Sequence, residues 1–91
     1  RRTYIAKPGQ AERVVELLKS GLAFVPFQPT YRLCISDVGP FNLVALDIDF
    51  KDLAEYERFW TGVAEKSTEE WRKLWFSATD NGGQNEIWQL V

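Results

Sequence analysis

The first quarter of the chain combines a short run of strand-forming residues with a longer helical pattern. Residues 1–7 are rich in β-formers and stop at Pro8-Gly9, which predicts a strand followed by a turn. From Gln10 to about Val25 the apolar residues fall on one helical face, which predicts an amphipathic helix ending before Pro26. The apolar positions of that helix are Ala11, Val14, Val15, Leu18, Leu22 and Val25.

Two runs of alternating residues follow, over 30–37 and 42–50, and a Gly39-Pro40 turn separates them. Alternation with a period of two is typical of strands that are buried on one face. The two runs therefore predict an antiparallel hairpin. In the second run one face carries Val44, Leu46, Ile48 and Phe50, and the other carries Leu43, Ala45, Asp47 and Asp49.

The second half of the chain predicts helical structure and a last strand. Asp52, with Glu55 three positions later, is typical of a capped helix start, and apolar residues then recur at helical spacing to Val63. Ser67-Thr68-Glu69-Glu70 is a second start signal, so we expect two helical pieces with a bend at 65–68, or one kinked helix. We expect the segment Asp80-Asn81-Gly82-Gly83 to break the helix and 84–91 to form the last strand.

The resulting order, β-α-β-β-α-β, predicts an α+β, ferredoxin-like fold for residues 1–91, with a four-stranded antiparallel sheet and the helices on one face. The other face carries a mixed set of side chains, expected to include Leu43, Ala45 and Trp88 beside Arg32, Asp47 and Asp49. Apolar residues on a bare sheet favour a partner, most simply a second copy on a twofold axis. The sequence thus predicts a homodimer whose two sheets enclose a barrel.

The amino-acid composition excludes several kinds of partner, metal site and catalytic site. The 91 residues suit one domain, and a net charge of −2 with 26% charged residues gives no reason to expect nucleic acid or an anionic membrane as partner. The chain has no His, which excludes haem held by His, His-ligated zinc and His-based triads. Asp and Glu alone suit only weak Mg²⁺ or Ca²⁺ binding, so we expect no metal and no cofactor.

The cellular location of the protein is inferred from features that the sequence lacks. No apolar run approaches the roughly 20 residues of a membrane span. The single cysteine, Cys34, allows no internal disulfide, which is typical of a reducing compartment, so we expect the cytoplasm. The chain opens at Arg1 and contains no Met, so we expect that the true start, with any targeting segment, is missing.

Two carboxylates on one strand are candidates for catalysis. Asp47 and Asp49 are two positions apart, about 6.6 Å along a strand, on the face away from the helices. Crowded carboxylates in a cleft raise one pKa and provide a general base or acid. The alternative, which we favour, is that they lie at an exposed strand end or pair with Arg32 on the neighbouring strand.

Arg2 and Tyr4 share one face of the first strand, which is central in this fold. A buried Arg needs a carboxylate, and we expect Asp47 or Asp49 on the adjacent strand to provide it. This arrangement is either a structural ion pair, which we favour, or the polar end of a pocket for an anionic or carbonyl-bearing ligand. In a catalytic site the Tyr4 hydroxyl would donate to a developing oxyanion.

The remaining candidates are aromatic or sulfur-containing. The helical tryptophans fall at core spacing, so packing is their default role, although Trp60 or Trp75 at the barrel mouth can line an apolar pocket. Trp88 is expected on the open face of the sheet, beside the ligand. Cys34 shares its face with Arg32 but has no His as base, so we interpret it as a buried packing residue.

Three short segments resemble one family, the NIPSNAP-like domains, over nearly the whole chain. The segments are Arg2-Thr3-Tyr4-Ile5-Ala6-Lys7-Pro8-Gly9, Gly39-Pro40-Phe41-Asn42 and Asp52-Leu53-Ala54-Glu55-Tyr56-Glu57. The resemblance implies the dimeric α/β-barrel superfamily, which includes small-substrate monooxygenases, muconolactone isomerases and haem-degrading enzymes. The His ligand of the haem-using relatives has no counterpart here.

Three functional hypotheses follow. The first is a domain that binds a small apolar or aromatic molecule inside the barrel, with the ligand against Arg2, Tyr4, Arg32, Asp47, Asp49, Trp60 and Trp88. The second is a cofactor-independent monooxygenase or isomerase of the superfamily kind, in which Asp47 or Asp49 abstracts a proton and Tyr4 or Arg2 stabilises the enolate. The third is a structural or protein-interaction module without a ligand.

Overall fold

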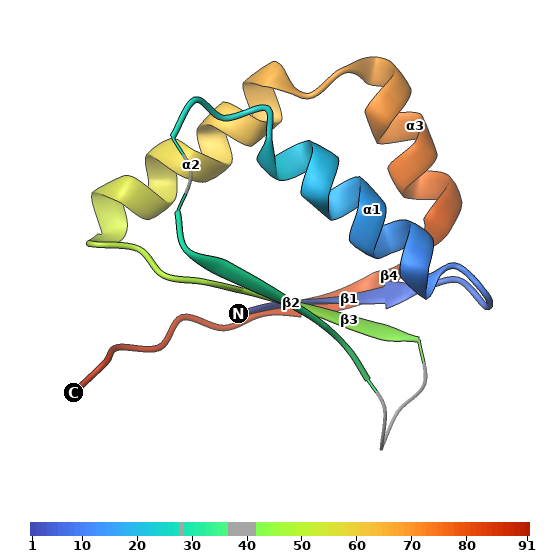
Figure 1. Ribbon diagram of the computed structural model, residues 1–91, viewed down its shortest axis with the longest axis horizontal. Coiled ribbons are helices and arrows are strands. Elements are labelled where there is room, and N and C mark those ends of the chain that lie inside the picture. Colours follow the sequence, from blue (N-terminus) through green and yellow to red (C-terminus); the bar gives the residue numbers. More distant parts are fainter. Residues whose placement is uncertain (28, 37–41) are drawn as a thin grey trace.

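The computed structural model describes residues 1–27, 29–36 and 42–91. Within these residues four strands form one sheet, and three helices lie together on one side of it (Figure 1). The elements are β1 (Arg2–Ala6), α1 (Ala11–Leu22), β2 (Tyr31–Ile35), β3 (Leu43–Ile48), α2 (Leu53–Lys66), α3 (Glu69–Ala78) and β4 (Thr79–Asn85). The expected Gly39-Pro40 turn lies outside the described residues.

The sheet has the strand order β2-β3-β1-β4, and every neighbouring pair is antiparallel. The predicted ferredoxin-like α+β fold is therefore confirmed. Both central strands, β1 and β3, pair along nearly their whole length, with Arg2 opposite Leu46 and Tyr4 opposite Val44.

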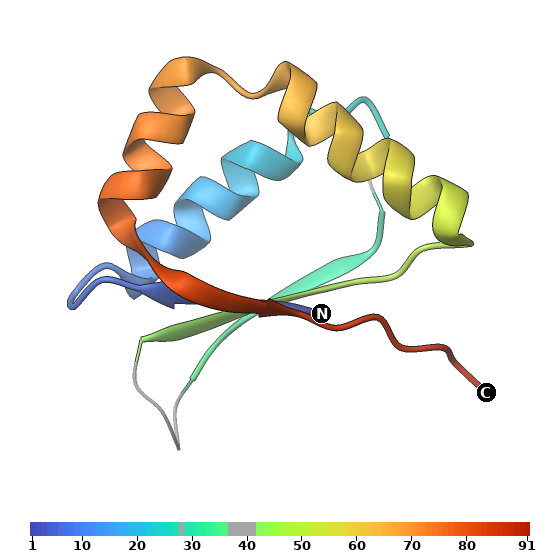
Figure 2. The same cartoon turned by 180° about the vertical axis from the view of Figure 1, so that it is seen from behind.

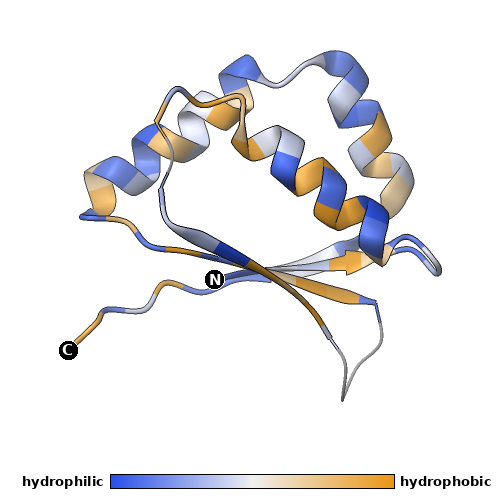
Figure 3. Ribbon diagram, viewed as in Figure 1, coloured by the Kyte–Doolittle hydropathy of each residue, from blue (hydrophilic) through white to orange (hydrophobic). Residues whose placement is uncertain are grey.

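The core lies between the sheet and the helices, and none of the described helices covers the other face of the sheet (Figure 2). Val44 and Leu46 of β3 point into the core and are almost completely buried, as is Phe59 of α2. Apolar positions of α1 face the sheet, while its polar positions face outward (Figure 3). The alternation read from the sequence of β3 therefore assigns its buried face correctly.

Side-chain caps explain why the second helical region is divided. The Asp52 carboxylate accepts a hydrogen bond from the Glu55 amide at the start of α2, and the Thr68 hydroxyl accepts one from the Trp71 amide at the start of α3. Between the two helices Ser67 is extended. The prediction of two helical pieces is confirmed.

The last strand begins earlier than predicted. β4 starts at Thr79, directly after α3, and it includes the Asp80-Asn81-Gly82-Gly83 segment, which we expected to break the helix and to precede the strand. The β1–β4 register shifts between Thr3 and Ile5, so this segment forms an irregular strand rather than a loop. Residues 86–91, predicted as the body of the strand, lie outside it and are exposed.

Gly83 is needed because two backbones approach closely. A Cβ atom at this position would lie 2.5 Å from the Thr3 carbonyl oxygen, which is backbone and cannot rotate away. We expect Gly83→Ala to separate β1 from β4 and to lower the free energy of unfolding by about 1–3 kcal/mol. Urea denaturation measures this change.

Gly62→Ala is the matched control for Gly83→Ala. Gly62 is inside α2, and an added Cβ would meet only Val25 methyl groups at 3.5 Å. The helix propensity of alanine predicts a gain of up to about 1 kcal/mol. Equal effects of the two substitutions would contradict the close β1–β4 approach.

Candidate functional site

A cavity of about 180 Å³ lies between the sheet and all three helices. Four of its side chains are aromatic, and we call it the aromatic cavity. Its lining consists of Arg2, Tyr4, Leu18, Gly21, Leu22, Leu46, Trp60, Val63, Trp71 and Trp75. None of these lining residues carries a carboxyl group. The lining is apolar apart from the Arg2 guanidinium, the Tyr4 hydroxyl and the nitrogens of the indole rings.

The indoles of α3 are held in place by stacking and by hydrogen bonds. Trp71 and Trp75 stack with their ring centres 5.4 Å apart, and Tyr4 meets Trp75 edge to face at 4.9 Å. The Trp71 Nε1 donates to the Leu17 carbonyl at 2.9 Å. Gly21 gives this ring its space, because a Cβ atom there would lie 2.7 Å from the Trp71 Cζ2. These rings form a rigid wall.

Arg2 lies across the opposite wall, over the face of Trp60. Its Cζ is 3.9 Å from the indole centre, which is cation–π geometry. Its Nη2 donates to the Tyr56 hydroxyl at 3.4 Å, and the same hydroxyl accepts from the Asn85 Nδ2 at 2.9 Å. The Arg2 Nε and the Trp60 Nε1 are buried, and neither has a hydrogen-bond partner among the described residues.

No family model, curated protein or solved structure matched this chain in our comparisons.

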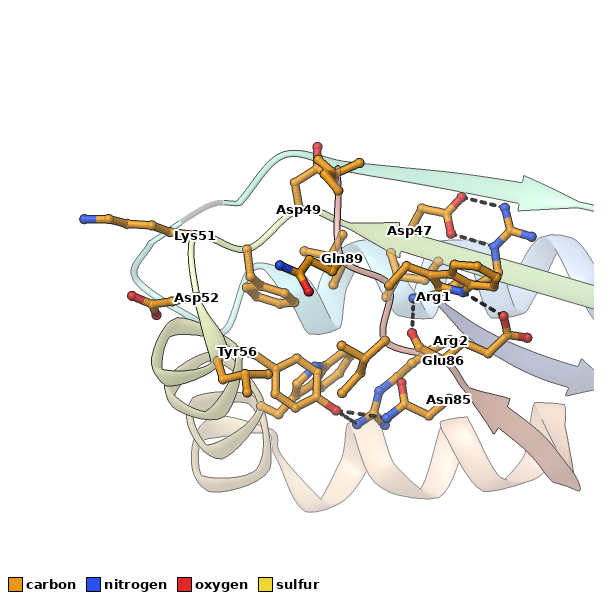
Figure 4. Close-up of a pocket in the computed structure, with 18 of the residues that line it drawn as sticks. Arg1, Arg2, Asp47, Asp49, Lys51, Asp52, Tyr56, Asn85, Glu86 and Gln89 are labelled. Carbon is orange, nitrogen blue, oxygen red and sulfur yellow. Dashed lines mark hydrogen bonds and ion pairs between the residues drawn. The ribbon is translucent and has the colours of Figure 1, made fainter.

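A second, larger hollow lies at the end of the sheet where β3 leads into α2. It has a volume of about 1160 Å³ and is open to solvent, and we call it the strand-end groove (Figure 4). Its walls are the end of β3 with the following residues 49–52, the first turns of α2, and the segment 85–90. Arg2, Leu46 and Trp60 line both hollows, so they form the boundary between the groove and the aromatic cavity.

The structure divides the predicted site residues between these two hollows. Tyr4 lies in the aromatic cavity and Arg2 and Trp60 lie on the boundary. The other candidates, Arg32, Asp47, Asp49 and Trp88, line only the strand-end groove.

The expected pairing of Arg2 with Asp47 or Asp49 is wrong. Arg2 is opposite Leu46 in the sheet and shares its helix-facing side, whereas Asp47 is one residue further and points to the other face. Asp47 instead accepts two hydrogen bonds from the Arg1 side chain, at 2.7 and 3.0 Å. Tyr4 and Asp47 are thus on opposite sides of the sheet.

The pKa values of Asp47 and Tyr4 also bear on the catalytic roles expected of them. The hydrogen bonds from Arg1 lower the pKa of Asp47, the reverse of the raised value expected for a catalytic acid. Burial raises the pKa of Tyr4, so its hydroxyl keeps its proton and remains a donor. The hydrogen bond from Arg2 lowers the pKa of Tyr56.

Two further expectations differ from the structure. Cys34, interpreted as a buried packing residue, is exposed on the open face because β2 is an edge strand. Trp88 lies beyond β4 and is 79% exposed, with its Nε1 donating to the Glu86 carboxylate at 2.9 Å.

Within the described ranges no helix is long and apolar enough to cross a membrane, and no group of three or more His, Cys, Asp or Glu could hold a metal ion.

Sequence reasoning missed Tyr56, Asn85 and the pairing role of Arg1. Tyr56 and Trp60 are four positions apart, as are Trp71 and Trp75, so each pair shares a helix face. From that spacing alone, a helix face rich in aromatic side chains could have been predicted. The contact of Asn85 with Tyr56 depends on where β4 begins, which the sequence pattern places wrongly.

Proposed function

We propose that this domain binds a small apolar or aromatic molecule in the aromatic cavity. The observation that carries the proposal is a cavity of about 180 Å³ with four aromatic side chains and two unpartnered N–H donors. An apolar cavity of about 150 Å³ is large enough to take up benzene. A ligand with one ring therefore fits the available volume. The proposed place of the ligand is between the sheet and the helices, not on the open sheet face.

Binding is better supported than catalysis. Among the described residues that line the aromatic cavity none is a carboxylate, and Asp47 and Asp49 lie outside it. The monooxygenase or isomerase hypothesis required Asp47 or Asp49 to act on the same substrate as Tyr4 or Arg2. Tyr4 and these carboxylates line different hollows, and Arg2 lies at the boundary between the two. A fully packed interaction module is disfavoured by the cavity itself, since unfilled space lined by Trp rings costs contacts.

Titration with toluene tests the binding proposal. The indole N–H resonances of the four tryptophans report on separate places in ¹⁵N-labelled protein. Toluene is expected to shift the signals of Trp60, Trp71 and Trp75 and to leave Trp88 unchanged, because only Trp88 is outside the cavity. Shifts confined to Trp88, or no shifts at saturation, would overturn the proposal.

We also propose that the chain is NIPSNAP-like, forms a homodimer through its open sheet face and resides in the cytoplasm. Ile5, Leu43 and Ala45 lie side by side on that face in the β1–β3 register. The same face carries Arg32 and Asp47, so a twofold axis can bring opposite charges together. The exposed thiol of Cys34 on this face suits a reducing compartment.

Ala45→Arg is expected to make the protein monomeric. Ala45 lies on the central strand β3 between Thr3 and Cys34, so a charged side chain there meets the middle of the proposed interface. Sedimentation velocity measures the outcome, and Ala54→Arg, at an exposed position of α2, is the matched control. A monomeric wild-type protein, or a dimeric Ala45→Arg variant, would contradict the interface.

A further inference from the structure

We propose that the ligand of the aromatic cavity is an aromatic carboxylate, whose carboxyl group is bound by the side chains of Arg2 and Trp60. The inference rests on the proposed function and adds the charge and the orientation of the ligand. The ring lies among the indoles of α3, and the carboxylate lies at the boundary with the strand-end groove.

The charge of Arg2 is the first argument. Arg2 is part-buried, and within the described part of the chain it contacts the Trp60 face and the Tyr56 and Tyr4 hydroxyls, all of which are uncharged. The described ion pairs join other residues, such as Arg1 to Asp47. A guanidinium removed from water favours an anionic partner, because its charge is otherwise poorly compensated. A ligand carboxylate would provide that partner.

The two free donors are the second argument. The Arg2 Nε and the Trp60 Nε1 come from different elements, β1 and α2, and each is buried without a partner in the part of the chain that the structure describes. The Arg2 Cζ lies 3.9 Å from the centre of the Trp60 ring, and both side chains line the aromatic cavity and the strand-end groove. Buried donors are nearly always satisfied in native proteins. A carboxylate has two acceptor oxygens and can satisfy both donors, whereas a hydrocarbon ring satisfies neither.

The contacts around Arg2 fix its position independently of a ligand. The Tyr56 hydroxyl accepts from both Arg2 and Asn85, which ties α2 to β4 in front of the guanidinium. The stack on Trp60 restricts the other side. A positively charged group held in this way loses little conformational entropy when an anion binds. Tyr56 is therefore a positioning residue for Arg2.

The test compares three probes of similar shape: benzoate, benzamide and toluene. Affinities are measured by NMR titration of the full chain. We expect benzoate to bind at least about tenfold more tightly than benzamide or toluene, as charge-assisted hydrogen bonds are the stronger ones. Arg2→Gln is expected to abolish that preference, so that benzoate and benzamide bind with similar affinities. Arg1→Gln, which removes an exposed cation paired with Asp47, is the matched control and should preserve the preference.

A second variant covers the case in which Arg2→Gln does not fold. Trp60→Phe keeps an aromatic ring and removes the N–H donor, so the preference for benzoate over benzamide should fall several-fold. Equal affinities of benzoate and toluene in the wild-type protein would overturn the carboxylate inference but leave the proposed function standing. Failure of all three probes to bind would overturn the proposed function itself.

Discussion

Phe59→Ala is expected to be among the most destabilising single substitutions in the chain, with a cost of about 3–5 kcal/mol. The Phe59 side chain is 0% exposed and contacts three other rings. Its centre lies 5.8 Å from Phe27, 5.5 Å from Phe50 and 5.1 Å from Trp60. Removing the ring leaves a void that these neighbours cannot all fill. Total stability of a small domain is about 5–15 kcal/mol, so the variant is expected to be partly unfolded at 37 °C.

Urea denaturation followed by Trp fluorescence measures the effect of Phe59→Ala. Phe76→Ala is the matched control, because Phe76 is 68% exposed on α3 and its loss is expected to change stability by less than about 0.5 kcal/mol. A cost below about 1 kcal/mol for Phe59→Ala would contradict the core described here.

Val63→Phe is expected to abolish ligand binding while preserving the fold. Val63 lines the aromatic cavity from α2, opposite the α1 residues Leu18 and Leu22, so a phenyl ring at this position occupies the space proposed for the ligand. Filling existing space costs little stability, whereas displacing the ligand removes nearly all of its contacts. We expect toluene affinity to fall by at least about tenfold.

The control for Val63→Phe is Ala64→Phe, which adds the same ring on the exposed side of the same helix. Toluene titration of both variants gives the comparison, and far-UV circular dichroism verifies the fold. Undiminished toluene binding by a folded Val63→Phe variant would show that the ligand is bound elsewhere.

Local signals in the sequence predict most of the fold. The helix α1 (Ala11–Leu22) follows from its apolar face, although it ends before the predicted Val25, and the start of α2 follows from Asp52, whose cap is present in the structure. The last strand is predicted wrongly because Gly82-Gly83 is a turn signal by composition. In the structure Gly83 allows β4 to approach the Thr3 carbonyl, a requirement that only the neighbouring strand reveals.

The candidate site is less predictable because strand pairing decides which residues meet. Alternation shows that Arg2 and Tyr4 share a face, but not that this face is the one that carries Leu46. Because Arg2 shares its face with Leu46, it lies on the other side of the sheet from Asp47, and the two side chains do not form the expected ion pair. The role of Trp71 and Trp75 is likewise decided by packing against Gly21 and Tyr4 from distant parts of the chain.

The most direct test of the central claim is diffraction from crystals soaked in bromobenzene, with data collected at the bromine absorption edge. An anomalous peak is expected between β1 and the helices, surrounded by Trp60, Trp71 and Trp75. Bromine peaks confined to the surface, with the space beside Tyr4 filled by ordered water or by side chains, would contradict a ligand site in the aromatic cavity.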